Sequence, residues 1–318
     1  MMEEQLETKR YKEGRRFFIY APPLRGKAFG GRESKRTPPN APYTGAPSWK
    51  TSVYYYWWEF LRRSEAYKKC CKNGGKGKLS KLYADFGDVF VERDGKYGTE
   101  FHTFWDWWIS EHPVSKQNRG QTLFGEPPAR RLAETVSSTA PNDDTLVIEV
   151  PLELRTAFLV DQFRKVLQEH DKRHKTAQAK SRALYPVHTK PVLSALHTAL
   201  VVYDAKQRWD ERNKKLYKKQ PLWMLFDELK EQLEYFYVSE EHVIKDEAGE
   251  NADVKFSLPK MLKQKAEGKL DYYDEIYLSE VKKVVNARKA NAVLRQERIA
   301  KQYIKNVENG EFPKKNSR

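Results

Sequence analysis

The sequence contains very few cysteines. Among its 318 residues there are two, Cys70 and Cys71, and they are adjacent. Neighbours in the chain rarely form a disulfide with each other, and no Cys-x-x-Cys pair offers the spacing of zinc ligands. The sequence therefore excludes a disulfide-stapled scaffold and a cysteine-based zinc finger, and it is typical of a protein of the reducing cytoplasm.

Long apolar runs are also missing. No stretch approaches the roughly 18–20 apolar residues that a transmembrane helix needs. The chain begins with charged residues and no apolar run behind them, in the sequence MMEEQLETKRYKEGRRFF. We therefore expect neither a membrane span nor a secretory signal peptide. The expected location is the cytoplasm, without a membrane partner.

Signatures of common catalytic sites are absent or incomplete. The Gly-x-Ser-x-Gly motif of serine hydrolases is missing, and the glycine-rich segment 74–78 lacks the spacing of a phosphate-binding loop. His170 and His174 have the i, i+4 spacing of two metal ligands on a helix. However, an Asp-Lys-Arg segment separates them and the catalytic glutamate of a zinc protease is not there. We expect no cofactor and no metal ion.

A metal-dependent nuclease is a further alternative, because clustered carboxylates can hold a divalent ion. The available carboxylates are Asp85, Asp88, Asp143, Asp144 and Glu149. A strand that carries Glu149 after two aspartates is typical of such a site. Pro151, however, stands two residues beyond Glu149, where a nuclease motif carries lysine. The expected protein is therefore not an enzyme.

Basic residues, in contrast, are abundant. The chain has 59 Lys and Arg against 44 Asp and Glu, which gives a formal net charge of +15. Net charge indicates partners rather than fold, and a polyanion is the simplest partner for such a surplus. DNA and RNA are favoured over an anionic membrane surface. The alternative is a basic protein without a polyanionic partner.

Residues 1–50 are interpreted as an extended basic arm. Prolines and glycines recur from Ala21 to Trp49 and exclude a sustained helix. Such an arm can follow a phosphate backbone or enter a minor groove; alternatively, it wraps its own protein. The arm residues expected to contact nucleic acid are Arg25, Lys27, Arg32, Lys35 and Arg36.

Aromatic residues define an expected helical domain at 51–136. One stripe consists of Tyr54, Trp57, Trp58 and Leu61, and a second of Phe101, Phe104, Trp105 and Trp108. The first stripe predicts a helix that continues to about Lys72. Two stripes of matched helical spacing predict a shared core, because aromatic side chains bury large areas. The alternative is an exposed platform that stacks unpaired bases.

A linker at 137–144, rich in Ser, Asp, Pro and Asn, is expected to precede a second helical domain at 145–318. Helices of this domain are expected to begin near Glu153, Pro191, Pro221 and Ser279, and the last to end at a cap formed by Asn309-Gly310. Short strands are expected at 82–91 and 145–150. The predicted fold class is mainly α, with two helical regions, minor β structure and the extended arm.

The C-terminal half carries a recognisable order of elements. A helix with Leu196–Asp204 precedes one that starts at Pro221, and the last helix ends in Asn306-Val307-Glu308-Asn309-Gly310-Glu311-Phe312-Pro313. This pattern resembles helix-turn-helix modules of uncharacterised bacterial proteins, often associated with mobile elements, whose last helix ends in Asn-Val-x-x-Gly-x-Phe-Pro. The resemblance covers most of 50–315 and implies a helix-turn-helix-like module without an assigned activity. The turns at 209–220 and 239–253 depart from it, since they are long and charged.

The sequence therefore predicts a non-enzymatic nucleic-acid-binding protein, with DNA favoured over RNA. The expected role is a DNA-binding regulator or accessory factor of a bacterial mobile element or phage-related system. The last helix is expected to present cations to guanine edges and phosphates. These cations are Lys282, Lys283, Arg288, Lys289, Arg295, Arg298, Lys301 and Lys305. The alternative for this helix is a solvated, basic surface helix. The alternative function is a structural or assembly subunit, with protein partners or further copies of the chain.

Overall fold

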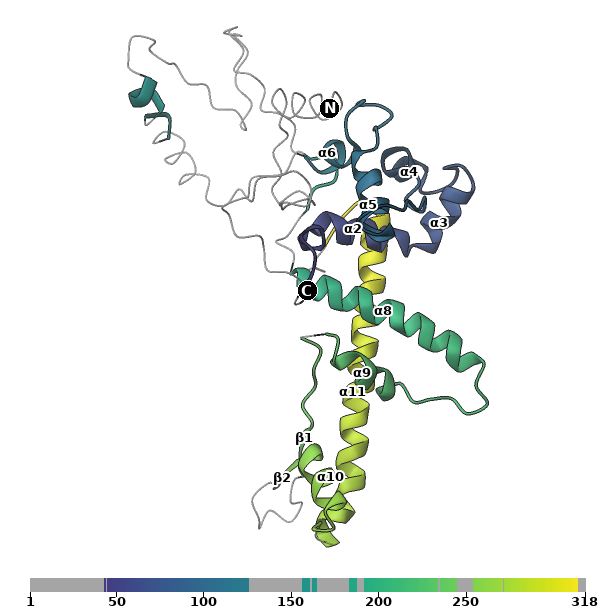
Figure 1. The fold of residues 1–318 in the computed structure, drawn as a ribbon, viewed down its shortest axis with the longest axis vertical. Helices are drawn as coiled ribbons and strands as arrows, with labels where there is room; N and C mark the ends of the chain where they lie inside the picture. Colours follow the sequence, from purple (N-terminus) through teal and green to yellow (C-terminus); the bar gives the residue numbers. More distant parts are fainter. Residues whose placement is uncertain are drawn as a thin grey trace. The chain divides into compact units, whose positions relative to one another are not determined.

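The computed structural model describes residues 43, 45–125, 156–160, 162–164, 183–187, 192–233, 235–244, 254–270 and 272–313. These residues are mainly helical (Figure 1), which confirms the predicted fold class. The chain divides into two compact units, Met1–Phe17 with Glu126–Ala183 and Phe18–Gly125 with Leu184–Arg318. In the first unit, residues 156–160 and 162–164 are helical, in agreement with the helix expected after Glu153.

The first elements described in the second unit are a 3-10 turn and two short helices. They are η2 (Ser48–Thr51), α2 (Val53–Arg62) and α3 (Glu65–Lys72). The sequence predicted one helix through to Lys72, and this was wrong because Ser64 caps a new helix. Its Oγ accepts a hydrogen bond from the Tyr67 backbone N–H at 2.9 Å, as a serine N-cap does.

The segment expected as a strand at 82–91 is helical in its first half. Helix α4 (Ser80–Phe86) buries Leu82 and Phe86, which are four residues apart and share one side of the helix. Gly87 ends the helix with a φ of 67°, a conformation that glycine adopts without strain. The prediction was wrong because the i, i+4 apolar spacing outweighed the short apolar run. Helices α5 (Thr99–Ile109) and α6 (Arg119–Phe124) follow.

The C-terminal half of the second unit contains four helices and a small sheet among its described residues. They are α8 (Leu193–Lys214), α9 (Trp223–Lys230), β1 (Glu241–Ile244), β2 (Val254–Ser257), α10 (Leu258–Ala266) and α11 (Tyr272–Glu308). The strands pair antiparallel, from Glu241 opposite Ser257 to Ile244 opposite Val254. The sequence predicted a charged turn here and missed this sheet. The strand expected at 145–150 lies outside the described residues.

The aromatic stripes form a core, as predicted, except that Trp105 is only half-buried at its edge. Tyr54, Trp57, Trp58, Phe101, Phe104 and Trp108 are all at most 3% exposed. The ring of Trp57 lies 5.2 Å from that of Phe124 and 5.5 Å from that of Phe312, measured between centroids. These six side chains therefore offer no exposed platform for stacking bases. Residues from 185–200 and 300–312 belong to the same core, so the two expected domains share one set of buried side chains.

Helix α11 connects three hydrophobic clusters. It packs against α2, α8, α9, α10 and β1 (Figure 1, where α11 runs from green into yellow). Its N-terminal part contributes Val281 and Val285 to a cluster with α10, and Val293 joins a cluster with α8 and α9. Ala300 and Val307 reach the aromatic core. One side of α11 is therefore internal along the length of the helix.

The Asn-Val-x-x-Gly-x-Phe-Pro signature is a helix cap. The Asn306 carbonyl accepts from the Glu311 N–H and the Val307 carbonyl from the Gly310 N–H, both at 3.0 Å, and Gly310 has a φ of 72°. This is the double hydrogen bond of a Schellman motif, and it confirms the predicted cap. After this cap the chain changes direction, and Phe312, which is fully buried, packs against Trp57 and Phe60.

Candidate nucleic-acid interface

The basic residues predicted on the last helix all lie on α11, but they differ in exposure. Six side chains are exposed: Lys282, Lys283, Arg295, Arg298, Lys301 and Lys305. Arg288 is half-buried, and its guanidinium donates hydrogen bonds to the carbonyls of Ser239 and Glu241. Arg288 therefore fastens the start of β1 to α11 and is only partly accessible.

Lys289 is an internal residue and corrects the prediction. It is 6% exposed, and its Nζ lies 3.0 Å from an Asp227 oxygen and 2.9 Å from a Glu240 oxygen. Burial lowers the pKa of Lys289, but hydrogen bonds to Glu240 and Asp227 outweigh this effect and raise it. Its charge is therefore neutralised inside the fold, where it ties α11 to α9 and to the segment before β1.

Four of the exposed cations form a patch that we name the α11 stripe. It consists of Arg295, Arg298, Lys301 and Lys305. Residues three, four and seven apart share a side of a helix, so Arg298, Lys301 and Lys305 point the same way. Lys301 pairs with Glu297 at 2.7 Å. Within the described part of the chain, the other three cations of the stripe form no ion pair.

The stripe does not continue to Lys282 and Lys283. Lys283 and Arg295 are twelve positions apart, which corresponds to about 18 Å along the helix. The exposed positions between the two groups are uncharged, namely Ala287, Asn291 and Leu294. The basic residues predicted over 282–305 therefore form two separate patches and not one continuous positive face.

Helix α9 stands where a recognition helix would follow α8, but its charge is unsuited to DNA. It buries Leu225, Phe226 and Leu229, and its charged residues are two acids and one lysine. That lysine, Lys230, pairs with Asp227 at 3.6 Å. The connection from α8 spans residues 215–222, longer than the three or four residues of a helix-turn-helix. Helix α9 thus lacks the cations with which recognition helices contact DNA.

A loop after α8 carries the densest run of exposed cations that we find in the described residues. We name residues 214–219 the lysine loop; its sequence is Lys-Lys-Leu-Tyr-Lys-Lys, without an acid. Every one of its residues is exposed, and Tyr217 has a relative exposure of 108%. None of its four lysines forms an ion pair with another described residue.

The base of the lysine loop is closed by a pair of hydrogen bonds. The Asn213 side chain donates from Nδ2 to the Gln220 carbonyl and accepts from the Gln220 N–H at Oδ1, each at 3.1 Å. Below it, Trp209 is 2% exposed in the cluster of α8, α9 and α11, and the Arg212 guanidinium stacks on its ring at 4.6 Å. The loop therefore projects from a fixed base.

Helix electrostatics explains only part of this loop. Lysines at the C-terminus of a helix interact favourably with the negative end of its dipole, which accounts for Lys214 and Lys215. Lys218 and Lys219 lie beyond the helix, and Tyr217 contributes nothing to a core. The sequence predicted only a long, charged turn at 209–220. The missed signal was an acid-free lysine run interrupted by an aromatic residue.

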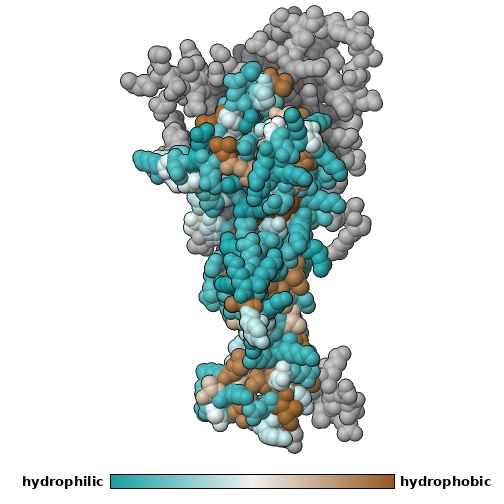
Figure 2. Space-filling view, turned by 90° about the vertical axis from the view of Figure 1, so that its right-hand side faces the viewer, coloured by the Kyte–Doolittle hydropathy of each residue, from teal (hydrophilic) through white to brown (hydrophobic). Residues whose placement is uncertain are grey.

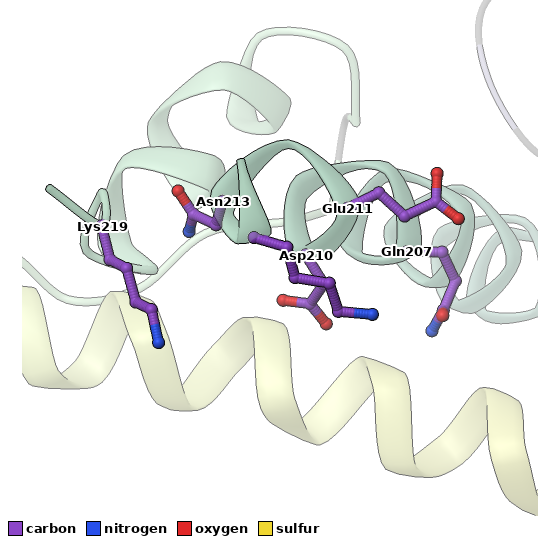
Figure 3. Close-up of a pocket in the computed structure, with 6 residues that line it drawn as sticks. Gln207, Asp210, Glu211, Asn213 and Lys219 are labelled. Carbon is purple, nitrogen blue, oxygen red and sulfur yellow. The ribbon is translucent and has the colours of Figure 1, made fainter. Parts of the chain in front are cut away.

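A shallow depression of about 350 Å³ lies beside the loop. It is lined by Gln207, Asp210, Glu211, Asn213, Lys214 and Lys219 (Figure 3). In this view Gln207, Asp210 and Lys219 extend from α8 and the loop toward the same side. Figure 2 faces the side on which α8 ends and shows a largely hydrophilic surface at mid-height.

The depression is electrostatically linked to the α11 stripe. Asp210 pairs with Lys206 at 2.6 Å. A hydrogen bond to Glu297 raises the pKa of Lys301, and the negative charge of Asp210 adds to this effect. Helix α8 packs against α11, and in Figure 3 α11 runs beside the part of α8 that carries Gln207 and Asp210, so the stripe and the depression lie on neighbouring helices. The lysine loop, the depression and the α11 stripe therefore form one candidate interface.

The carboxylates considered for metal binding have structural partners where they are described. Asp85 accepts a hydrogen bond from the Tyr185 hydroxyl at 2.6 Å, and Asp88 accepts from the Phe90 N–H at 2.8 Å. No group of three His, Cys, Asp or Glu in the described residues has a geometry that could hold a metal ion. The other candidates lie outside the described residues: Asp143, Asp144, Glu149, His170 and His174.

The N-terminal arm is likewise outside the described residues, and so are its five predicted contacts, Arg25, Lys27, Arg32, Lys35 and Arg36. Among the helices that the structure describes, none has the length and apolar content to cross a membrane. Comparisons with protein families, with curated proteins and with solved structures found no match. Function is therefore inferred from the geometry of the candidate interface.

Proposed function

We propose that the protein binds nucleic acid through the lysine loop and the α11 stripe, without catalysing a reaction. The observation that carries this proposal is the lysine loop. Four lysines without ion pairs in the described residues surround a fully exposed tyrosine, on a base closed by Asn213 and Gln220. Lysines in such an arrangement gain contacts with phosphates without losing internal partners.

The energetics favour a polyanion as the ligand. Each lysine or arginine that neutralises a phosphate releases condensed counterions, and this release drives binding at low salt. The proposed contacts are Lys214, Lys215, Lys218 and Lys219 with the exposed stripe cations Arg295, Arg298 and Lys305. Internal cations such as Lys289 take no part, because their charges are already matched by carboxylates.

The biological role belongs to the same proposal. The resemblance of the C-terminal half favours a DNA-binding regulator or accessory factor of a bacterial mobile element, and the two free cysteines suit a cytoplasmic location. In this role the protein contacts the nucleic-acid backbone mainly by charge. Helix α9, whose charged residues are mostly acidic, does not act as the reading helix.

The test is a fluorescence-anisotropy titration of the full chain against labelled duplex DNA, single-stranded DNA and RNA, at low and at physiological salt. Binding with a Kd of about 1 μM or tighter at low salt, falling steeply as salt rises, supports the proposal. The Arg295/Arg298/Lys305→Ala variant should bind more weakly and with a shallower salt dependence. Absence of binding at low salt would overturn the proposal.

A second candidate function is assembly with protein partners, and one observation favours it. Tyr235 and Tyr237, between α9 and β1, are 64% and 82% exposed. Figure 2 also shows apolar surface among hydrophilic residues at the end of the second unit that carries β1, β2 and α10. Exposed aromatics are typical of contact surfaces. Light scattering of the wild type and of a Tyr235/Tyr237→Ser variant tests this candidate, which predicts a wild-type oligomer that the variant dissociates.

A further inference from the structure

We infer that the depression beside the lysine loop holds an unpaired base of a single-stranded nucleic acid, with Tyr217 stacking on a neighbouring base. This inference rests on the proposed function and narrows its ligand. It draws on the exposure of Tyr217 and on the polar lining of the depression, neither of which is needed for binding phosphates by charge alone.

Tyr217 supplies a surface on which a base can stack. Its ring is fully exposed and lies at the tip of a loop with two lysines on either side. Proteins that bind single strands combine aromatic rings, on which bases stack, with cations that follow the backbone. The bases of a duplex already stack on each other and cannot reach such a ring. Tyr217 therefore contributes to the binding of single strands and not of duplexes.

The charges around the depression set the orientation of the ligand. Asp210 and Lys219 line it and extend toward the same side in Figure 3, whereas Glu211 points away from that side. Asp210 repels phosphate and Lys219 attracts it, so a nucleotide enters with its base toward Asp210 and its phosphate toward Lys219. The reverse orientation brings like charges together and is disfavoured.

The lining also indicates which bases fit. A carboxylate accepts hydrogen bonds only, and the Gln207 amide both donates and accepts. Exocyclic amino groups, such as N4 of cytosine, donate to carboxylates. Asp210 has acceptor positions left, because its hydrogen bond to Lys206 uses one oxygen. Cytosine and adenine, which carry an amino group, therefore suit the site better than thymine, which has none.

The experiment compares labelled oligo(dC), oligo(dT) and a mixed-sequence duplex of equal length, bound by the full-length wild type and by three variants. The wild type should bind oligo(dC) more tightly than oligo(dT). Tyr217→Ala should weaken oligo(dC) binding by about 5- to 150-fold, the range measured for loss of one stacked base, and leave duplex binding unchanged. Tyr217→Phe, which keeps a ring, should retain oligo(dC) affinity.

Asp210→Asn tests the base contact separately from stacking. It should reduce the preference for oligo(dC) over oligo(dT) without weakening the duplex complex, because an amide presents donors as well as an acceptor to the base. An unchanged thermal midpoint for each variant confirms that the fold is retained, as expected for exposed Tyr217 and for a substitution at half-buried Asp210 that keeps the size of the side chain.

Three outcomes overturn the inference. One is equal loss of duplex and oligo(dC) affinity in Tyr217→Ala, and another is no loss in either. The third is equal binding of oligo(dC) and oligo(dT) by the wild type. In all three cases salt-dependent binding to nucleic acid remains and the proposed function stands. Failure of the wild type to bind any of the ligands would instead overturn the proposed function together with the inference.

Discussion

Two regions of the second unit use the same kinds of residue in opposite ways. The aromatic core buries Trp57, Trp58 and Tyr56 completely, whereas the lysine loop leaves Tyr217 fully exposed. The core residues recur at helical spacing on α2 and α5, so that their rings face each other. Tyr217 stands alone in a run of lysines. Neighbouring residues, rather than aromatic character, decide whether such a ring is buried or displayed.

Charged residues show the same contrast. Next to the core, Glu59 is 3% exposed and pairs with Arg62 and Arg63, and Arg63 also forms two hydrogen bonds with Asp204 at 2.7 and 3.0 Å. These charges fasten α2 to α8. The lysines of the loop have no such partners in the described residues. Cations near the core therefore serve the fold, and cations of the loop remain available to a ligand.

The largest expected effect is the loss of stability when a residue of the aromatic core is replaced. Trp57→Ala should lower the free energy of unfolding by about 3–5 kcal/mol, since it removes a fully buried ring and leaves a cavity. Denaturant unfolding followed by circular dichroism measures the loss. Tyr217→Ala, which removes an exposed aromatic ring, should change the free energy of unfolding by less than about 0.5 kcal/mol.

Trp57→Phe sharpens this test. It keeps an aromatic ring and removes an indole N–H that has no hydrogen-bond partner among the described residues. Its loss should therefore be clearly smaller than that of Trp57→Ala. Equal destabilisation by Trp57→Ala and Tyr217→Ala would contradict the distinction between a buried and a displayed aromatic residue.

An intermediate effect is expected for the internal cation of α11. Lys289→Ala leaves Asp227 and Glu240 without their shared partner, and should lower the free energy of unfolding by about 2 kcal/mol. The loss is below that of a fully buried pair because both carboxylates keep some contact with water. Lys282→Ala on the same helix is the control and should have almost no effect. Equal losses of stability in Lys289→Ala and Lys282→Ala would contradict an internal role for Lys289.

A further effect expected near the core is a dependence of stability on pH. The pKa of His197 is lowered from 6.5 to about 4, mainly by burial and to a smaller extent by the positive charge of Lys50. The native state thus prefers neutral His197, and the unfolded state binds the proton more readily. This contribution is fully present above about pH 6.5 and is lost as the pH falls toward 4.

His197→Phe is the matched variant, because it keeps a ring against Tyr43, whose centroid lies 4.4 Å from that of His197. Denaturant unfolding at several pH values between 4 and 6.5 should show a smaller loss of stability on acidification in the variant than in the wild type. Identical pH profiles for the two proteins would contradict a half-buried His197 that is neutral in the folded protein.

The sequence predicted the aromatic core and the helix cap at Gly310 because both depend on local spacing. Helical periodicity places Tyr54, Trp57 and Trp58 on one side, and the glycine at the end of a helix marks its cap. The helix break at Ser64 and helix α4 were missed because each depends on a competition between local signals. A capping serine outweighed a continuing apolar stripe, and an i, i+4 pair outweighed a short apolar run.

The candidate site was only partly predictable for a different reason. Lys289 and Arg295 are both basic residues of one long helix, but Lys289 is four residues from Val285 and four from Val293 and therefore shares the internal side of α11, whereas Arg295 does not. What the sequence does not show is that Asp227 and Glu240, residues distant in sequence, neutralise the charge of Lys289 there. The lysine loop was detectable in principle, because an acid-free basic run with an aromatic residue needs no tertiary information.

The most direct test of the account compares two variants that lose the same charge. Lys214/Lys215/Lys218/Lys219→Ala removes the lysines of the loop, and Lys72/Lys76/Lys78/Lys81→Ala removes four exposed lysines from the α3–α4 region. The affinity for single-stranded DNA is measured by anisotropy over a range of salt concentrations. We predict that the loop variant binds more weakly and that its salt slope is shallower by about 3, from about 0.7 per lost phosphate contact, while the control keeps the wild-type slope. Equal slopes in the two variants would contradict a localised interface at the lysine loop.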